Sequence, residues 1–218
     1  MSKYIYLSHF LDTDTKLYGG EKSTIISSHK SISKGDSSNT TFLSFCNHAG
    51  THIDFPKHFS NNGKTVNDYL PDFWVFNRPY ILDYKARENE IINIPFELYN
   101  IPDETDFLIV KTGFQKYRNK DKYWKYNPGL DPDFALKVRK RCPYIRIVGF
   151  DFISVSSFQN RELGRKAHKE FLINNDILLI EDMNLGELSD NLKKIICLPL
   201  MIDNIDGSPV TIIGEISE

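Results

Sequence analysis

At 218 residues the chain is long enough to bury one sizeable core, and we expect a single domain over residues 1–218. Its 40% hydrophobic and 26% charged residues are ordinary for a soluble globular protein, and a net charge of -2 gives no electrostatic reason to expect nucleic acid or an anionic membrane as partner. No apolar run reaches the roughly 20 residues of a membrane span, no signal peptide is evident, and three cysteines without a C-x-x-C pair favour a reduced, cytoplasmic protein.

The first half of the chain reads mainly as strands. Residues 4–8 alternate and are rich in strand formers, and residues 23–33 predict a second strand or an ordered arm. A further strand at 40–46 leads into a cluster of histidines. The short apolar runs 80–84 and 107–111 are bounded by turn residues, which is typical of buried strands.

The second half adds helices. The polar, aromatic stretch 119–130 predicts a loop, after which Asp131 can cap a helix that has Pro132 in its first turn and ends before Pro143. The elements expected beyond it are a strand at 144–149, a helix at 161–174, a strand at 177–180 ending at Glu181, and a strand pair at 195–201 and 209–214 around the turn 206–208. Strands mixed with modest helices predict an α/β or α+β domain.

The most informative segment has eleven residues, from His48 to His58. It contains His48, His52 and His58, which are three of the six histidines of the chain, and the carboxylate of Asp54. Imidazoles and carboxylates are ligands that Zn²⁺ and Mn²⁺ take. Fully extended, ten residues would span about 33 Å, so the segment must bend before these side chains can meet. Gly50 and Pro56 supply suitable bending points.

One short loop rarely completes a catalytic metal site, so further ligands are expected from the second half. His168 lies on the predicted helix 161–174, and Glu181 ends the strand that follows it. A helix, a short turn and an adjoining strand could bring both to one end of the sheet. Taken alone, His168 fits a surface position on its helix, and Glu181 is one of many glutamates; together with the first cluster they are the ligand types that would complete a two-metal site.

The run His48-x-Gly-Thr-His52-x-Asp54-x-Pro-x-His58 resembles the signature of the cyclase family that contains bacterial kynurenine formamidase (arylformamidase) and isatin hydrolase. Weaker landmarks follow in family order over nearly the whole chain. They are Leu7-Ser8, Lys111-Thr-Gly-Phe114, Gly149-Phe-Asp151-Phe-Ile-Ser154, and the pair Ala167-His168 and Ile180-Glu181.

The resemblance implies a swivelling β/β/α domain, usually a homodimer or homotetramer, holding one or two Zn²⁺ per subunit or a single Mn²⁺. His48, His52 and Asp54 correspond to ligands of a first metal, with Asp54 bridging to a second. His168 and Glu181 correspond to the remaining ligands. His58 corresponds to the general acid and base, which would protonate the leaving nitrogen after a metal-activated water attacks the carbonyl.

The chain departs from the family in three places. The Asp expected before Leu-Ser is Tyr6, and the tryptophan that stacks on aromatic substrates in kynurenine formamidases is absent. Tyr18 could stack instead, and Phe59 could line the same pocket, although aromatic residues so placed often belong to the core. The interval from His168 to Glu181 is also about one residue longer than in typical members.

Three hypotheses remain open. The first is a metal-dependent hydrolase of an amide or formamide, acting like an arylformamidase that converts N-formylkynurenine to kynurenine and formate. The second is an enzyme that opens a lactam or lactone ring, as isatin hydrolase does, or closes one as a cyclase. The third is a non-catalytic protein that binds a metal or ligand on the same fold; the presence of His58 argues against it, because such a protein needs no proton shuttle.

Overall fold

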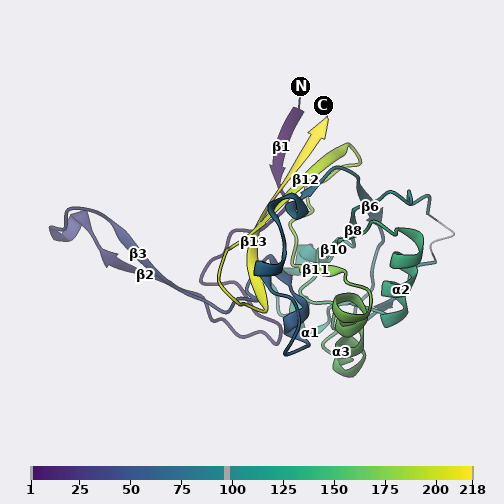
Figure 1. The fold of residues 1–218 in the computed structure, drawn as a ribbon. Coiled ribbons are helices and arrows are strands. Elements are labelled where there is room, and N and C mark those ends of the chain that lie inside the picture. Colours follow the sequence, from purple (N-terminus) through teal and green to yellow (C-terminus); the bar gives the residue numbers. More distant parts are fainter. Residues whose placement is uncertain (1, 96–98, 218) are drawn as a thin grey trace.

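The computed structural model describes residues 2–95 and 99–217, and its body is built on one nine-stranded sheet (Figure 1). In spatial order the strands are β5 (Val75–Phe76), β12 (Leu192–Pro199), β13 (Gly207–Ser217), β4 (His52–Asp54), β11 (Leu178–Glu181), β10 (Ile147–Phe150), β8 (Phe107–Lys111) and β6 (Pro79–Asp83), while β1 (Ser2–Tyr6) pairs with β13. Strands β6, β8, β10 and β11 run parallel, and β4 is antiparallel to both β11 and β13. The short strand β4 therefore lies between the parallel half and the C-terminal strands.

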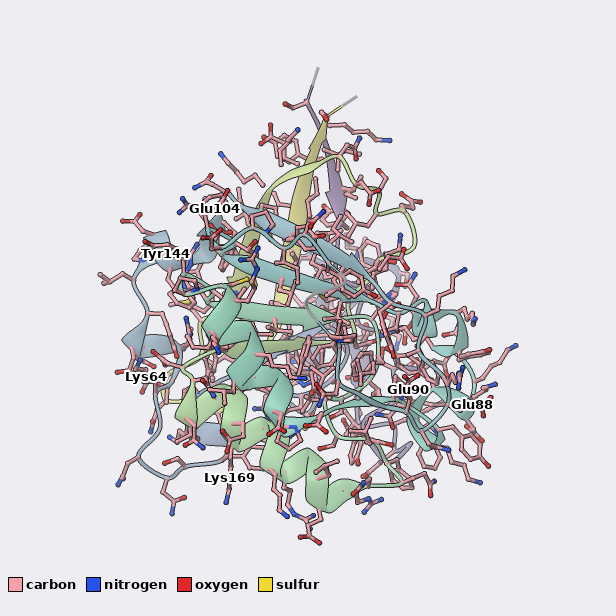
Figure 2. All side chains as sticks on the ribbon, turned by 90° about the vertical axis from the view of Figure 1, so that its right-hand side faces the viewer. Lys64, Glu88, Glu90, Glu104, Tyr144 and Lys169 are labelled. Carbon is pink, nitrogen blue, oxygen red and sulfur yellow. The ribbon has the colours of Figure 1, made fainter. Side chains whose placement is uncertain are left out.

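Helices cover the parallel half of the sheet on one face (Figures 1 and 2). Helix α2 (Pro132–Arg141) lies in the connection from β8 to β10, and α3 (Arg161–Lys169) lies in the connection from β10 to β11. Parallel neighbours require such crossovers. Strands β8, β10 and β11 are almost entirely buried, as expected for strands with both faces covered. The predicted mixed α/β class is confirmed.

The two helices begin as the sequence predicts. The Asp131 side chain accepts a hydrogen bond from the backbone N–H of Asp133 at 2.9 Å and caps α2, in which Pro132 is the first residue. The predicted helix 161–174 is α-helical only to Lys169, and residues Glu170–Asn174 form a π-helix. A π-turn takes up one residue more than an α-turn.

The prediction of an unbroken loop over residues 119–130 is wrong. This stretch contains the short helix α1 (Lys122–Lys125) and the strand β9 (Gly129–Leu130), which pairs in parallel with β7 (Ile91–Ile92). Burial of the Tyr123 ring fixes α1 against the body, a tertiary contact that local composition does not reveal. The C-terminal strand pair is present, but β13 runs from Gly207 to Ser217 and is longer than predicted at both ends; the predicted turn at 206–208 is therefore wrong, because Gly207 and Ser208 already belong to the strand.

The first strand ends at Tyr6, two residues before the predicted end. Strands β2 (Ile25–Lys30) and β3 (Thr40–Ser44) pair only with each other and form a hairpin that projects from the body (Figure 1). All of their residues are exposed. Short 3₁₀ helices occupy Ile32–Lys34, Pro56–His58, Val66–Asp68, Pro71–Trp74 and Phe114–Tyr117. Within residues 2–95 and 99–217, no helix has the length and apolar character needed to cross a membrane.

Candidate metal centre

Strand β4 carries the middle of the histidine cluster. His52 and Asp54 are two residues apart on this extended piece, so their side chains leave the same face of the strand, with His52 Nε2 3.5 Å from Asp54 Oδ1. His48 reaches them from the preceding turn, which Gly50 allows by adopting φ of 67°. The His48 Nδ1 atom lies 2.9 Å from Asp54 Oδ1. The chain bends at Gly50, one of the two points indicated by the sequence.

The second half of the chain brings His168 and Glu181 to the same place. His168 lies near the end of α3, with Nε2 3.6 Å from Asp54 Oδ2 and 3.7 Å from Glu181 Oε1. Glu181 ends β11 directly beside His52 in the sheet, and its Oε2 lies 3.5 Å from His52 Nε2. Glu181 Oε1 also accepts hydrogen bonds from the Ser154 hydroxyl and the Val155 N–H. The five predicted metal ligands therefore converge on one point.

The Asp54 carboxylate lies at the centre of this cluster. Its side chain is buried, and neither of its oxygens has a hydrogen-bond partner of acceptable geometry in the described part of the chain. A buried carboxylate without partners is costly unless a cation or donor meets it. The surrounding donor set of imidazole nitrogens and carboxylate oxygens is the one that binds Zn²⁺ or Mn²⁺. The residues present thus fit a divalent metal.

The outward-facing nitrogens of the three rings are held in place. His52 Nδ1 lies 2.8 Å from the Gly50 carbonyl oxygen, and His168 Nδ1 lies 2.8 Å from that of Gly164. A carbonyl oxygen can only accept, so each Nδ1 carries the proton and, in the neutral ring, Nε2 presents its lone pair to the cluster. His48 is turned the other way, with Nε2 2.9 Å from Asp206 Oδ2 and Nδ1 toward Asp54. Such outer partners fix the orientation of metal-binding histidines.

The charges of the cluster favour ion pairing when no metal is bound. Burial opposes protonation of His48, but the neighbouring Asp206 and Asp54 carboxylates outweigh it and raise the pKa of His48 to about 10. Burial likewise opposes protonation of His168, whereas Asp54 and Glu181 raise its pKa to about 9. Burial also opposes ionisation of Asp54, yet the His168 and His48 rings hold its pKa well below the usual range.

These pKa values predict that metal binding releases protons. Below about pH 9 both the His48 and the His168 ring of the metal-free chain are doubly protonated and positively charged. A metal ion can bind only the neutral ring, which has a free lone pair. We expect calorimetric titration with Zn²⁺ at pH 7.5 to show release of about two protons from these rings, so that the measured heat depends on the buffer. The apparent affinity for Zn²⁺ should rise with pH until both rings are neutral in the metal-free protein. A heat that is independent of the buffer would contradict this assignment.

His58 lies beside the cluster rather than at its centre. It belongs to the 3₁₀ helix Pro56–His58, and one of its ring nitrogens comes within 4.8 Å of ligand atoms of Asp54 and His168. Its Nδ1 lies 2.9 Å from Asp206 Oδ2, and its ring is partly exposed. With Nδ1 held by a carboxylate, Nε2 is the nitrogen available to exchange protons with a substrate. This position is compatible with the predicted acid and base role.

Asp206 is a site residue that the sequence analysis missed. Its Oδ2 meets both His48 Nε2 and His58 Nδ1, and its Oδ1 accepts a hydrogen bond from Asn47 Nδ2 at 2.9 Å. The hydrogen bond from His48 holds the pKa of Asp206 well below the usual range, so the carboxylate is charged. The local sequence offers only a carboxylate in the predicted turn 206–208. Its contact with His48 spans more than 150 residues of sequence and is not visible in a local pattern.

The segment after Glu181 is held by a second group of polar contacts. Asp182 adopts a left-handed conformation with φ of 54°, which is uncommon outside glycine. Its carboxylate binds the Arg118 guanidinium at 2.9 Å and accepts a hydrogen bond from the Tyr123 hydroxyl. Thr51 donates its hydroxyl hydrogen to the Asp182 carbonyl, so the residue between Gly50 and His52 ties the two ligand segments together.

Gly207 is required by the close approach of β13 to His48. A Cβ atom at this position would come within 2.4 Å of His48 Cε1. Because Asp54 and Asp206 hold the His48 ring from both sides, it cannot move without losing its orientation. We expect Gly207→Ala to lower metal affinity by about 10–100-fold, as loss of an outer-shell partner does, and to leave the circular dichroism spectrum unchanged.

Thr211→Ala is the matched control for this substitution. Thr211 lies on the same strand and is exposed. The metal affinity of the Thr211→Ala protein should therefore equal that of the wild type. Equal affinities of the Gly207→Ala and Thr211→Ala proteins, measured by competition with a chromogenic chelator, would show that the His48 orientation does not control binding.

A cavity of about 430 Å³ opens above the cluster. All five candidate ligands contribute to its lining, together with His58. Tyr18 and Phe59, the predicted substrate contacts, also line it. The Phe59 ring stacks on His168 with 4.5 Å between ring centroids, and the Tyr18 ring packs edge-on against Phe158 at 5.6 Å. The volume suits a small organic molecule, and the aromatic walls suit a flat one.

The fold and the site together define an α/β protein with a histidine and carboxylate cluster at the floor of a small-molecule cavity. Solved structures with the same fold include isatin hydrolase A from Labrenzia aggregata, with a TM-score of 0.83 and 19% identity over 100% of this chain and 94% of that one. A second is a structure described as a potential metal-dependent hydrolase with cyclase activity, with a TM-score of 0.78 and 19% identity over the full length of both chains.

Sequence comparison gives the family. The model described as "Putative cyclase" matches residues 5–157. A kynurenine formamidase of Bacillus thuringiensis subsp. konkukian (strain 97-27) is 32% identical over 212 residues, which cover 96% of this chain and 95% of the relative. The chain therefore belongs to this cyclase family, and the resemblance found in the sequence is confirmed.

Proposed function

We propose that this protein is a metal-dependent hydrolase that cleaves the C–N bond of an amide or formamide, with arylformamides such as N-formylkynurenine as substrates. The observation that carries the proposal is the buried Asp54 carboxylate, whose oxygens lie 2.9–3.6 Å from ring nitrogens of His48, His52 and His168 and have no hydrogen-bond partner of acceptable geometry among the described residues. The full-length similarity to a relative named kynurenine formamidase supports the choice of substrate class.

The positions of the side chains suggest how the ligands would be shared. His48 Nδ1, His52 Nε2 and Asp54 Oδ1 would hold one metal ion. His168 Nε2, Asp54 Oδ2 and Glu181 would hold a second, if two are bound. Zn²⁺ is the proposed ion, with Mn²⁺ as the alternative for a single-metal site. When bound, such an ion would supply an activated water and polarise the substrate carbonyl.

His58 completes the proposed reaction by moving a proton. Its Nδ1 is held by Asp206, so the ring is oriented and Nε2 is the position at which a proton can be taken up and passed on. The leaving nitrogen of an amide needs a proton before it departs, and His58 Nε2 would deliver it. The negative charge of Asp206 would stabilise the ring while it carries the extra proton. Tyr18 and Phe59 would flank an aromatic leaving group.

A substrate panel tests the proposal. Metal-loaded protein would be assayed with N-formylkynurenine, formanilide, isatin and a simple lactone. Faster turnover of the two formamides supports the proposal. Activity confined to isatin or the lactone would instead support the ring-opening alternative, and a protein that hydrolyses none of these compounds would favour the non-catalytic one.

A further inference from the structure

Two arginines of α3 line the cavity above the proposed metal site. Arg161 and Arg165 precede His168 by seven and three residues, and all three side chains contribute to the cavity wall. Residues at this spacing share one face of a helix. With a rise of 1.5 Å per residue, the two arginines begin about 10 Å and about 4.5 Å above His168 along the helix axis.

Neither guanidinium is neutralised by an acidic side chain. Among the described residues no carboxylate lies within 4 Å of Arg161 or Arg165; Glu162, the acidic residue between them, instead pairs with Lys166 at 3.3 Å. The carboxylates at the cavity floor, Asp54 and Glu181, are in contact with histidines. The cavity wall therefore carries two positive charges without an acidic partner, alongside the metal-binding groups.

Aromatic contacts fix one of these arginines in place. The Arg161 guanidinium carbon lies 4.0 Å from the centroid of the Phe158 ring and 5.8 Å from that of Tyr18. Phe158 is in turn packed edge-on against Trp124 at 5.1 Å. Stacking on an aromatic face leaves the edge of a guanidinium, with its N–H donors, free for another partner. Arg161 is thus held beside Tyr18 with hydrogen-bonding capacity to spare.

We infer that the substrate carries a carboxylate, which Arg161 and Arg165 bind while the scissile carbonyl lies at the metal-binding cluster. Guanidinium groups bind carboxylates through paired, charge-assisted hydrogen bonds. The inference rests on the proposed function, which places the reacting group on the cavity floor. It narrows the substrate class to amides that also carry an anionic group. A neutral lactam such as isatin would leave both arginines without a partner.

Binding of a matched pair of product ligands tests the inference without requiring turnover. Kynurenine and kynurenine methyl ester share the aryl ketone and the α-amino group, and esterification removes the carboxylate charge; calorimetry on the metal-loaded protein gives both affinities. We expect the acid to bind at least tenfold more tightly than the ester. Arg161→Gln and Arg165→Gln should each lower affinity for the acid by at least tenfold and leave affinity for the ester within twofold.

Lys166→Gln is the matched control, because Lys166 is an exposed cation of the same helix that does not line this cavity. Its affinity for both ligands should equal that of the wild type. Equal affinity of the wild-type protein for acid and ester, including failure to bind either, would overturn the inference. Equal losses for acid and ester in the arginine variants would also overturn it, because they would indicate a structural role.

Hydrolysis of formanilide separates this inference from the proposed function. Formanilide has a formamide but no carboxylate, so the arginine substitutions should lower its turnover less than that of N-formylkynurenine, whereas Lys166→Gln should hydrolyse both at the wild-type rate. Absence of formanilide and N-formylkynurenine hydrolysis in the wild type would contradict the proposed function. The calorimetric comparison would still decide whether the arginines recognise a carboxylate.

Discussion

Asp54→Asn is expected to abolish both metal binding and hydrolysis. Asp54 lies at the centre of the cluster, with Oδ1 toward His48 and His52 and Oδ2 toward His168. An amide keeps the shape but loses the charge and offers one oxygen in place of two. Because loss of an outer-shell partner typically costs about 10–100-fold in metal affinity, loss of this central ligand should cost more than about 100-fold. Metal content per chain and formanilide turnover measure the effect.

Asp83→Asn provides the control for this experiment. Asp83 is an exposed carboxylate at the end of β6 in the same sheet. This variant should retain wild-type metal content and activity, and circular dichroism should show that both variants are folded. A folded Asp54→Asn protein with normal metal content would exclude the central role assigned to this carboxylate.

His58→Ala is expected to separate metal binding from catalysis. Removal of a general acid and base typically lowers turnover by about 10²–10⁴-fold. The metal content should stay at the wild-type level, because the five proposed ligands do not include this ring; they are His48, His52, Asp54, His168 and Glu181. Turnover of formanilide and metal analysis of the same sample provide the two readouts.

His29→Ala is the control for the loss of an imidazole. His29 lies on the projecting β2–β3 hairpin and is exposed, so its replacement should change neither readout. If His58→Ala lowers metal content in proportion to activity, His58 is a ligand rather than a proton carrier. Unchanged turnover would remove it from the mechanism altogether.

The sequence predicted those parts of the site that depend on local geometry. His52 and Asp54 share a strand face because they are two residues apart, and the chain reverses at Gly50 because glycine tolerates positive φ. The cap at Asp131 followed from the same kind of local rule. His168 and Glu181 are each unremarkable in their own segments; they were predicted as further ligands because their types would complete the first cluster, and the family resemblance implies the same pair.

Features that depend on tertiary contacts could not be predicted in this way. Asp206 reaches His48 and His58 only because β13 pairs with β4, which places the C-terminal turn beside the histidine cluster. Arg161 and Arg165 lie seven and three residues before His168, a spacing that places all three on one helix face. This spacing points to a binding role only once the helix is known to border the cavity. The helix α1 is likewise set by burial of Tyr123.

The most direct test of the account is metal removal followed by restoration. The protein would be stripped with a chelator, assayed with formanilide and N-formylkynurenine, and assayed again after stepwise addition of Zn²⁺ or Mn²⁺. We expect the stripped protein to be folded and inactive, and activity to return in full at one or two metal ions per chain. Undiminished hydrolysis by the metal-free protein would contradict the central claim that these residues form a catalytic metal site.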